Sequence, residues 1–478
     1  MSKELMIERI EKAQKEIEAK RETVQQGKFR QDYHFMAETG WINDPNGLIY
    51  FKGKYHFFYQ YNPYSGFWDC MHWGHAVSED MIHWEYLPLA LAPSEVYDDH
   101  LKGGCFSGSA IEHDGKLFLI YTGTCNNGNG FEQAQCIAYS EDGIHFEKYE
   151  GNPVITAPEG VPTDLFRDPK VWKHDDTYYV VCGASKNGFA QARLYKSTDM
   201  FHWEFVNVLA ESRGEWGYMW ECPDIFALDG HRILAVCPQG VPSEAEQYQN
   251  IYQSGYFIET EETRTVDASF KGIKENRNVN PSFIEWDMGF DFYAPQTFET
   301  PAGRRILIGW AGVPDAEYSS NPTNEGWQHS LTVPRELRYH NGKIYQLPIR
   351  ELGQLRKKEI LPEKESYVLD NGCGELIFDG IAASSSAAIC VQIGTGCSLS
   401  YEKGLVTLQF TDDSGAGRGK RVARCEAVHK IQILMDVSIL EIYINDGEIV
   451  MTSRIFFPEK DATVRFLGQA EMIQAWQL

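Results

Sequence analysis

One hairpin pattern recurs five times along the chain, and it restricts the fold more than any other feature of the sequence. Each copy is a turn containing Gly or Asp, then a basic or polar residue, then an apolar run with the composition of a β-strand. Successive runs begin 55 to 73 residues apart. The copies are Gly53-Lys54-Tyr55, Gly115-Lys116-Leu117, Asp176-Thr177-Tyr178, Gly230-His231-Arg232-Ile233 and Gly303-Arg304-Arg305-Ile306. This interval indicates one supersecondary unit repeated five times.

A second pattern follows the first three copies and gives the size of the unit. It reads Ser-x-Asp, then His three residues after the Asp, an aromatic residue and Glu, and it begins at Ser78, Ser140 and Ser197. Ser and Asp at this spacing favour a turn, which we place between the outer strands of each unit. Each unit then has about four strands, and four-stranded units repeated radially form a β-propeller. We therefore predict a five-bladed β-propeller over residues 33–346.

The segments on either side of the repeats differ from them in composition. Residues 1–32 begin with a charged, helix-favouring stretch whose apolar residues have loosely helical spacing, which predicts a short N-terminal helix packed on the body. Residues 347–359 are a charged linker, and residues 360–478 contain short strands separated by turns. Asn445-Asp446-Gly447 between two such strands is a strong hairpin signal. We expect a C-terminal β-sandwich, so the predicted fold class is all-β.

Composition restricts the partners. The chain has 44 Lys and Arg against 68 Asp and Glu, and a net charge of −24 argues against nucleic acid or an anionic membrane as the main partner. No export signal or membrane-spanning stretch is visible, and the 11 cysteines form no CxxC pair, which predicts reduced thiols in a cytoplasmic protein. Without His or Cys at ligand spacing, we expect no metal and no other cofactor. The oligomeric state is left open, a homo-oligomer included.

Three carboxylates lie at equivalent places before the hairpin runs. The intervals are 11 residues from Asp44 to Tyr55, 10 from Asp168 to Tyr178 and 12 from Glu221 to Ile233. In the two other units Ser107 and Gln296 hold this place. Because the innermost strands of a propeller surround one channel, equivalent positions converge at one end of it. The repeat register therefore predicts that the three carboxylates meet.

The first of these carboxylates lies in a run of turn-forming residues, Asn43-Asp44-Pro45-Asn46-Gly47. Pro45 fixes φ and Gly47 permits a positive φ, so the run predicts a tight turn that holds Asp44 at the mouth of the first hairpin. Taken alone, such a run is more often a plain surface turn. The aromatic surroundings and the two recurring carboxylates favour a functional site here.

Several motifs, in this order, resemble the successive signatures of glycoside hydrolase family 32, which comprises invertases, sucrose-6-phosphate hydrolases and fructan hydrolases. The motifs are Trp41–Gly47, Phe106–Ala110, Phe166–Lys170, Glu221–Asp224 and Tyr293–Gln296. Near the C-terminus, Asp436–Ser438, Glu441 and Asn445–Glu448 resemble the sandwich domain of that family. The resemblance implies a five-bladed propeller followed by a β-sandwich, in agreement with the repeat count.

The resemblance also implies roles for the site residues. Asp44 resembles the nucleophile, Glu221 the acid/base and Asp168 the carboxylate that stabilises the transition state. We expect burial near Met219, Trp220 and the partner carboxylates to help keep Glu221 protonated. The expected substrate-binding residues are Asn43, Gln60, Trp68, Phe106, Ser107, Arg167 and Trp310. Cys222 is interpreted as a small buried side chain without a catalytic role.

The resemblance implies a retaining glycoside hydrolase that cleaves terminal β-D-fructofuranosidic bonds in sucrose, sucrose 6-phosphate or short fructo-oligosaccharides. Two alternatives stay open at this point: a propeller glycosidase that acts on pentosides such as arabinan or xylan, and a non-catalytic sugar-binding propeller. The sequence does not decide between hydrolysis and transfer of the fructosyl group, nor whether a 6-phosphate is preferred. Lys102, in a loop just before Ser107, is a candidate phosphate contact.

Overall fold

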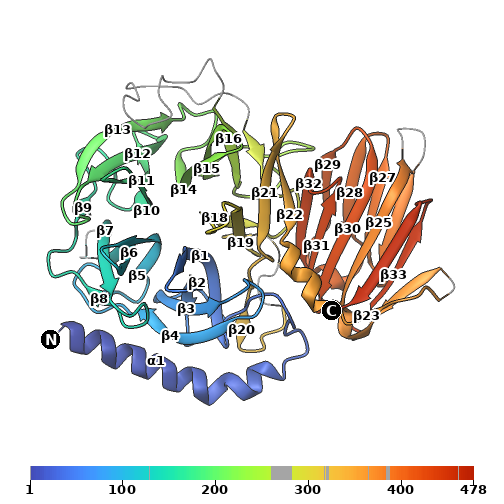
Figure 1. Ribbon diagram of the computed structural model, residues 1–478, viewed down its shortest axis with the longest axis horizontal. Coiled ribbons are helices and arrows are strands. Elements are labelled where there is room, and N and C mark those ends of the chain that lie inside the picture. The colour runs from blue at the N-terminus through green and yellow to red at the C-terminus, as the bar shows by residue number, and fades with distance from the viewer. Residues whose placement is uncertain are drawn as a thin grey trace.

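The computed structural model describes residues 2–126, 128, 130–259, 283–316, 318, 322–363, 365–383, 388–460 and 462–478. A ring of five small sheets lies beside a two-sheet sandwich, and a long helix lies along the outside of the ring (Figure 1). The predicted architecture of propeller, sandwich and N-terminal helix is confirmed. Among the residues described, no helix is long and apolar enough to cross a membrane.

Each of the five blades is an antiparallel sheet whose first strand lies nearest the channel (Figure 1). Blade 1 contains β1 (Gly40–Phe51), β2 (Lys54–Asn62), β3 (His72–Ser78) and β4 (Glu85–Leu91). Blade 2 contains β5 (Gly104–His113), β6 (Lys116–Asn126), β7 (Phe131–Ser140), β8 (Glu147–Lys148) and β9 (Ile155–Thr156). Blade 3 contains β10 (Phe166–His174), β11 (Thr177–Lys186), β12 (Phe189–Ser197) and β13 (Glu204–Glu211).

Blades 4 and 5 complete the ring. Blade 4 contains β14 (Met219–Leu228), β15 (His231–Gln239), β16 (Gly255–Ile258) and β17 (Ile284–Glu285). Blade 5 contains β18 (Tyr293–Glu299), β19 (Arg305–Trp310), β21 (Arg335–His340) and β22 (Lys343–Pro348). In sequence, β20 (Trp327–Gln328) belongs to blade 5, but it pairs in parallel with β1 of blade 1. This pairing joins the last blade to the first, and no local sequence signal predicts it.

Both repeated sequence patterns lie at the turns that the sequence analysis predicted. Each of the five hairpin copies turns the chain from the first strand of a blade into the second. The Ser-x-Asp pattern makes the turn from the third strand to the outermost one in blades 1 to 3. In the first copy, Asp80 accepts hydrogen bonds from the backbone N–H groups of Ile82 and His83. Because the Asp side chain satisfies backbone donors of the turn, the Ser-x-Asp pattern has a structural role.

The predicted tight turn around Asp44 is wrong. Residues Gly40–Phe51 form one continuous strand, β1, in which the register to β2 shifts on both sides of Pro45 and Asn46. The turn-forming residues therefore make bulges within a strand. Pro45 lacks an N–H and Gly47 has a φ of +56°, and both features suit a bulge as well as they suit a turn.

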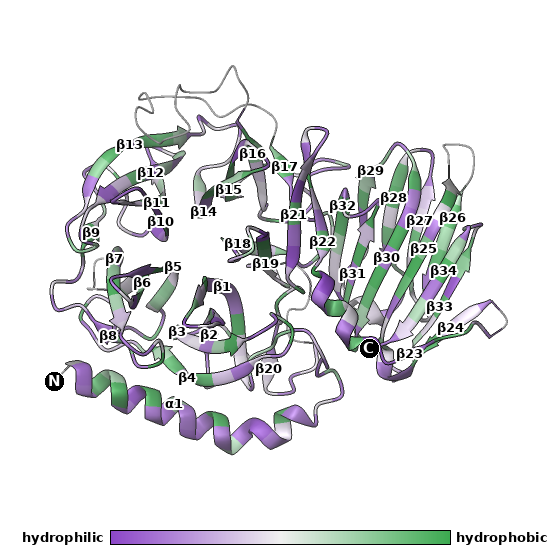
Figure 2. Ribbon diagram, in the orientation of Figure 1, coloured by the Kyte–Doolittle hydropathy of each residue, from purple (hydrophilic) through white to green (hydrophobic). Residues whose placement is uncertain are grey.

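The predicted N-terminal helix is α1 (Ser2–Gln25). Met6, Ala13, Ile17 and Val24 are buried, and hydrophobic and hydrophilic residues alternate along the helix (Figure 2). Ile7, which shares the loosely helical apolar spacing, is instead exposed. The helix packs along the first two blades and extends past β4 (Figure 1).

The C-terminal region is a sandwich of two six-stranded sheets. One sheet contains β23 (Lys358–Glu359), β34 (Met472–Gln477), β25 (Cys373–Ala383), β30 (Val428–Asp436), β31 (Ile439–Ile444) and β32 (Ile449–Arg454). The other contains β24 (Ser366–Leu369), β33 (Ala462–Leu467), β26 (Ile389–Ile393), β27 (Cys397–Glu402), β28 (Leu405–Phe410) and β29 (Lys420–Arg424). Aliphatic side chains from both sheets form one core. The predicted hairpin at Asn445 and Asp446 is confirmed, since both residues have a positive φ.

Short 3₁₀ helices complete the elements: η1 (Arg350–Leu355) follows the propeller, and η2 (Asp370–Gly372) and η3 (Asp413–Gly415) lie in the sandwich. The predicted residue limits of the domains stay predictions.

Buried charges join the propeller to the sandwich. Arg335 of β21 donates to Glu441 of β31 and to Asp287, and all three side chains are inaccessible to solvent. His34, in the segment that leads into β1, lies 2.9 Å from both Asp436 and Glu441. Buried carboxylates paired in this way fix the angle between the two domains, because separating them would leave charges unpaired.

Candidate active site

The innermost strands bring the predicted site residues together at one end of the channel. Asp44 lies near the start of β1, Asp168 near the start of β10 and Glu221 near the start of β14. They line one cavity of about 710 Å³. All ten residues expected to act in catalysis or substrate binding line this cavity: Asn43, Asp44, Gln60, Trp68, Phe106, Ser107, Arg167, Asp168, Glu221 and Trp310. Gln296 instead donates a hydrogen bond to the backbone oxygen of Gly108 below the cavity.

Backbone irregularities aim these side chains. Asp168 has a φ of 63° and Cys222 a φ of 48°, and each lies where the register between the first two strands of its blade shifts. Ala294, at the same place in blade 5, has a φ of 46°. A positive φ costs free energy in residues other than glycine, and bulges of this kind re-aim side chains near functional sites.

Asp44 is half-buried and held by two donors. Its Oδ1 accepts a 2.9 Å hydrogen bond from Asn43 Nδ2, and its Oδ2 accepts one from the Ser107 hydroxyl. Asn43 is in turn fixed by the Trp41 indole N–H, at 2.8 Å. Burial raises the pKa of Asp44 to about 6, against the hydrogen bonds from Ser107 and Asn43, which lower it. Asp44 is therefore ionised at neutral pH.

Asp168 lies deeper and faces the other two carboxylates. Its Oδ2 accepts a 3.0 Å hydrogen bond from the backbone N–H of Cys222, and its own N–H donates to Thr122 Oγ1. Burial raises the pKa of Asp168 above its usual range, and the Arg167 guanidinium opposes this rise.

Glu221 lies near Asp44 and Asp168, as expected, and donors also surround its carboxyl group. Arg167 donates to its Oε1 at 3.0 and 3.1 Å, and Gln239 and the Tyr293 hydroxyl each donate to its Oε2 at 2.6 Å. The neighbours Met219 and Trp220 are fully buried, and the Trp220 indole donates to the backbone oxygen of Trp216. Trp220 lies on the opposite face of the strand from Glu221, because residues next to one another on a strand face opposite sides.

Two of these donors were not identified from the sequence. Tyr293 was only part of a family motif, and Gln239 lies at the end of β15, outside every motif. A hydroxyl both donates and accepts, so Tyr293 keeps its hydrogen bond whether Glu221 is a carboxylate or a protonated acid. This residue therefore suits a partner that must gain and lose a proton.

The remaining pocket residues fall into a floor and a rim. Gln60 is buried and donates to the backbone oxygen of Cys105, while Trp310 is buried with an indole N–H that has no partner among the described residues. Trp68 is 39% exposed at the rim and packs edge-on against Phe106. A stacking ring and an unpaired donor are what a sugar ring with hydroxyl groups requires.

Cys222 lies between two of the carboxylates. Its Sγ is 3.7 Å from Asp44 Oδ2 and 3.8 Å from Asp168 Oδ2. A hydrogen bond with Cys237 and burial raise the pKa of the Cys222 thiol well above its usual range. A thiol of this kind is not a nucleophile at neutral pH, in agreement with the interpretation of a buried, non-catalytic side chain.

Three carboxylates around a pocket at one end of a five-bladed propeller define a glycosidase-type site, in which one carboxyl group attacks or stabilises a sugar and another transfers a proton. Residues 34–348 match the glycosyl hydrolases family 32 N-terminal domain, and residues 400–476 match the glycosyl hydrolases family 32 C-terminal domain. The chain belongs to glycoside hydrolase family 32.

Individual relatives agree with this assignment. The chain is 37% identical to a sucrose-6-phosphate hydrolase of Bacillus subtilis over 98% of both chains, and 37% identical to a raffinose invertase of Escherichia coli over 90% of both. Its fold is similar to that of a variant of a Bombyx mori GH32 β-fructofuranosidase in complex with sucrose. That similarity has a TM-score of 0.85 at 34% identity and covers 98% of this chain and 97% of the other.

Proposed function

We propose that the chain is a retaining β-fructofuranosidase that releases terminal fructose from sucrose-type substrates. The observation that carries the proposal is that Asp44, Asp168 and Glu221 line one cavity with Arg167. Cleavage of a fructoside passes through an oxocarbenium-like transition state, and it needs a carboxylate at the anomeric carbon and an acid at the leaving oxygen. The family and its sucrose-cleaving relatives support this substrate class.

In the proposed reaction, Asp44 attacks the anomeric carbon of the fructosyl unit. Its carboxylate forms an ester bond to that carbon while Glu221 gives its proton to the oxygen that leaves with the other sugar. A water molecule then attacks the same carbon, Glu221 takes the proton from the water, and the ester bond to Asp44 breaks. Two inversions at one carbon retain its configuration.

The other charged groups of the pocket stabilise the charge that develops. Asp168 is placed to accept hydrogen bonds from fructose hydroxyls, which strengthen as positive charge grows on the ring. Arg167 contacts Glu221 and lies 3.9 Å from Asp168 Oδ2, and its positive charge opposes the rise in the pKa of Asp168.

The floor of the pocket favours cleavage at a chain end. Gln296 of blade 5 donates to the Gly108 oxygen of blade 2 and so spans the channel below the site. Asn46 of blade 1 accepts a hydrogen bond from the Gly108 N–H of the neighbouring blade. A fructose unit enters against this floor and leaves only one side for the rest of the substrate. Small substrates such as sucrose or 1-kestose fit this arrangement.

Lys102 is the proposed contact for a phosphorylated substrate. It lines the pocket at the rim, is well exposed, and forms an ion pair with Asp69 at 3.4 Å. Arg167, the other cation that lines the pocket among the described residues, is already held by Glu221 and by the Asp164 carbonyl. A phosphate at the rim would compete with Asp69 for the Lys102 ammonium group.

We also propose the cytoplasm as the compartment. All eleven cysteines lie within the described residues and are free thiols, as a reducing environment would keep them.

The proposal is tested by comparing kcat/KM for sucrose, sucrose 6-phosphate and 1-kestose. We expect turnover of all three, and a preference for the phosphate that decreases in Lys102→Ala would assign the phosphate contact. The matched control is Lys12→Ala, which removes an exposed lysine of α1 outside the pocket. Activity on nitrophenyl arabinofuranoside with none on sucrose would instead favour the pentosidase, and a preference for long inulin would contradict a small substrate.

A further inference from the structure

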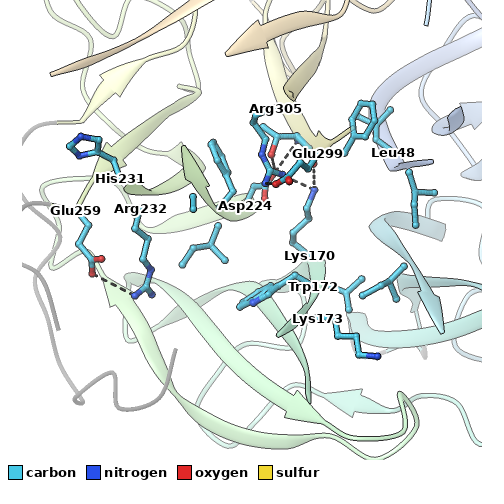
Figure 3. A pocket seen from close by; sticks show the side chains of 18 of the residues that line it. Leu48, Lys170, Trp172, Lys173, Asp224, His231, Arg232, Glu259, Glu299 and Arg305 are labelled. Atoms are coloured by element: carbon cyan, nitrogen blue, oxygen red, sulfur yellow. Dashed lines mark hydrogen bonds and ion pairs between the residues drawn. The ribbon is translucent and has the colours of Figure 1, made fainter. Parts of the chain in front are cut away.

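The opposite end of the propeller channel holds a second large cavity, of about 920 Å³ (Figure 3). The same innermost strands line it, further along each strand than the catalytic positions. The lining includes Ile49 of β1, Lys170 and Trp172 of β10, Asp224 of β14 and Glu299 of β18. Its size lies within the range of about 300–1,000 Å³ that is typical of small-molecule sites. The catalytic proposal uses none of these residues.

The charge of this cavity is opposite to that of the whole protein. Among the described residues that line it, four are cations and three are carboxylates. Lys170 pairs with Asp224, Arg232 with Glu259 and Arg305 with Glu299, while Lys173 lies over the Tyr178 ring. The chain as a whole carries a net charge of −24. A concave surface with a surplus of positive charge in such a protein attracts an anion that the rest of the surface repels.

Two buried polar atoms in the wall have no partner among the described residues. They are Arg305 Nε, a donor, and Asp224 Oδ1, an acceptor. The other oxygen of Asp224 accepts hydrogen bonds from Thr297 and lies 3.2 Å from Lys170 Nζ, while the far end of the Arg305 guanidinium pairs with Glu299 (Figure 3). Asp224 is only 2% exposed. Buried polar atoms are nearly always paired, so an unpaired donor and an unpaired acceptor in one wall indicate a ligand that carries both complements.

Burial also affects the three cations that are paired with carboxylates in this cavity. Burial lowers the pKa of Lys170, Arg232 and Arg305 below their usual values, because the nearby carboxylates do not fully offset the loss of hydration. A bound anion would restore the missing negative charge. The lowered pKa values agree with the excess of one cation over the carboxylates that line the cavity.

Aromatic rings supply an apolar wall. Trp172 and Phe226 line the cavity, and the Arg305 guanidinium lies over the Phe226 ring, 5.1 Å from its centre. Tyr179 stacks on the Trp172 indole, and the part of the indole that lines the cavity offers an apolar surface for a sugar ring.

We propose that this cavity binds a phosphorylated monosaccharide. The phosphate accepts from the Arg305 guanidinium and the neighbouring cations, a sugar hydroxyl donates to Asp224, and the sugar ring lies against Trp172. The site goes beyond the proposed fructosidase activity and does not depend on it, because binding at the far end of the channel requires no turnover.

The test is a calorimetric titration of the full chain with glucose 6-phosphate, inorganic phosphate and glucose. We expect saturable binding of glucose 6-phosphate, weaker binding of inorganic phosphate and no binding of glucose. Arg305→Gln should weaken glucose 6-phosphate binding at least about tenfold, the effect of losing a hydrogen bond to a charged group. Arg338→Gln is the matched control, because Arg338 is an exposed arginine of β21 outside the cavity.

A second variant and an active-site variant make the result decisive. Arg232→Gln, which alters a partly exposed residue of the same wall, should also weaken binding, and both variants should cleave sucrose at the wild-type rate. Trp310→Ala should leave glucose 6-phosphate binding intact. Binding that survives both arginine variants but is lost in Trp310→Ala would place the ligand in the catalytic pocket and overturn the proposal. Absence of saturable binding to the wild-type protein would overturn it as well.

Discussion

The Tyr293 hydroxyl lies 2.6 Å from Glu221 Oε2 and joins blade 5 to the proposed acid/base of blade 4. This contact orients the carboxyl group toward the pocket, and it survives a change in the protonation of Glu221 because a hydroxyl can donate or accept. We therefore expect Tyr293 to act as a positioning residue for proton transfer.

Tyr293→Phe should lower kcat on sucrose about tenfold, a fraction of the full contribution of a general acid. The loss should be smaller on an activated nitrophenyl fructoside, whose leaving group needs less protonation. Steady-state kinetics on both substrates measures the difference. Equal losses on the two substrates would show a merely structural role.

Glu221→Ala should lower kcat on sucrose by about 10²- to 10⁴-fold. Activity should recover on fructosides with good leaving groups, or when azide is added as a small external nucleophile. Glu215→Ala, at an exposed carboxylate in the loop before β14, is the control and should change neither rate. A uniform loss on activated and unactivated substrates would assign the acid role to another residue.

Ser107→Ala should shift the acidic limb of the pH–rate profile to higher pH by about one to two pH units. The limb reports ionisation of Asp44, whose pKa is raised to about 6 by burial and lowered by the hydrogen bond from Ser107. A hydrogen bond to a charged group is worth about 1.5–3 kcal/mol, so its loss raises the pKa by about one to two units. Ser109→Ala is the control, because Ser109 donates to the Pro169 carbonyl outside the pocket. If the acidic limb has the same position in Ser107→Ala and in the wild-type protein, the limb does not report the ionisation of Asp44.

The buried His34 predicts how stability depends on pH. Burial is the largest single effect on the pKa of His34 and lowers it. The hydrogen bonds that His34 donates to Asp436 and Glu441, together with the charges of these carboxylates, outweigh burial and raise the pKa to about 9 from an ordinary 6.5. Because the folded pKa is the higher one, this stabilisation is complete below pH 6.5 and is lost as the pH rises through 9. At about 1.4 kcal/mol per pKa unit, it amounts to about 3 kcal/mol.

Urea unfolding at pH 6 and pH 9.5 measures this effect. His34→Gln should be less stable than the wild-type protein at pH 6, and the difference should shrink at pH 9.5. His83→Gln, at an exposed histidine paired with Asp80, should show no such dependence. A constant difference between His34→Gln and the wild-type protein at both pH values would refute the assignment.

The sequence predicted the ring and its three carboxylates because both depend on a repeat. A fixed interval from each hairpin places Asp44, Asp168 and Glu221 at equivalent positions, and the closed ring then brings these positions together. Which polar residues complete the site is not encoded in the repeat. Gln239 reaches Glu221 from the second strand of its blade and carries no local signal.

Other features of the fold could not be predicted from local sequence patterns, because they depend on contacts between distant segments. The bulge at Pro45 resembles a turn in sequence, and only pairing with β2 makes it part of a strand. The pairing of Trp327 with Gly40 joins segments almost three hundred residues apart, and local propensity does not predict such contacts. The positive φ of Asp168 and Cys222 likewise depends on the packed ring, because these residue types do not require it.

The central claim is that Asp44 is the nucleophile of a fructoside-cleaving site, and the turnover of sucrose by Asp44→Asn tests it most directly. We expect kcat to fall about 1,000-fold or more, with an unchanged unfolding temperature, because the amide cannot form the ester bond to the sugar. Asp69→Asn, at the carboxylate paired with Lys102 on the rim, should keep kcat within about threefold of the wild-type value. A folded Asp44→Asn variant that hydrolyses sucrose at the wild-type rate would contradict the account.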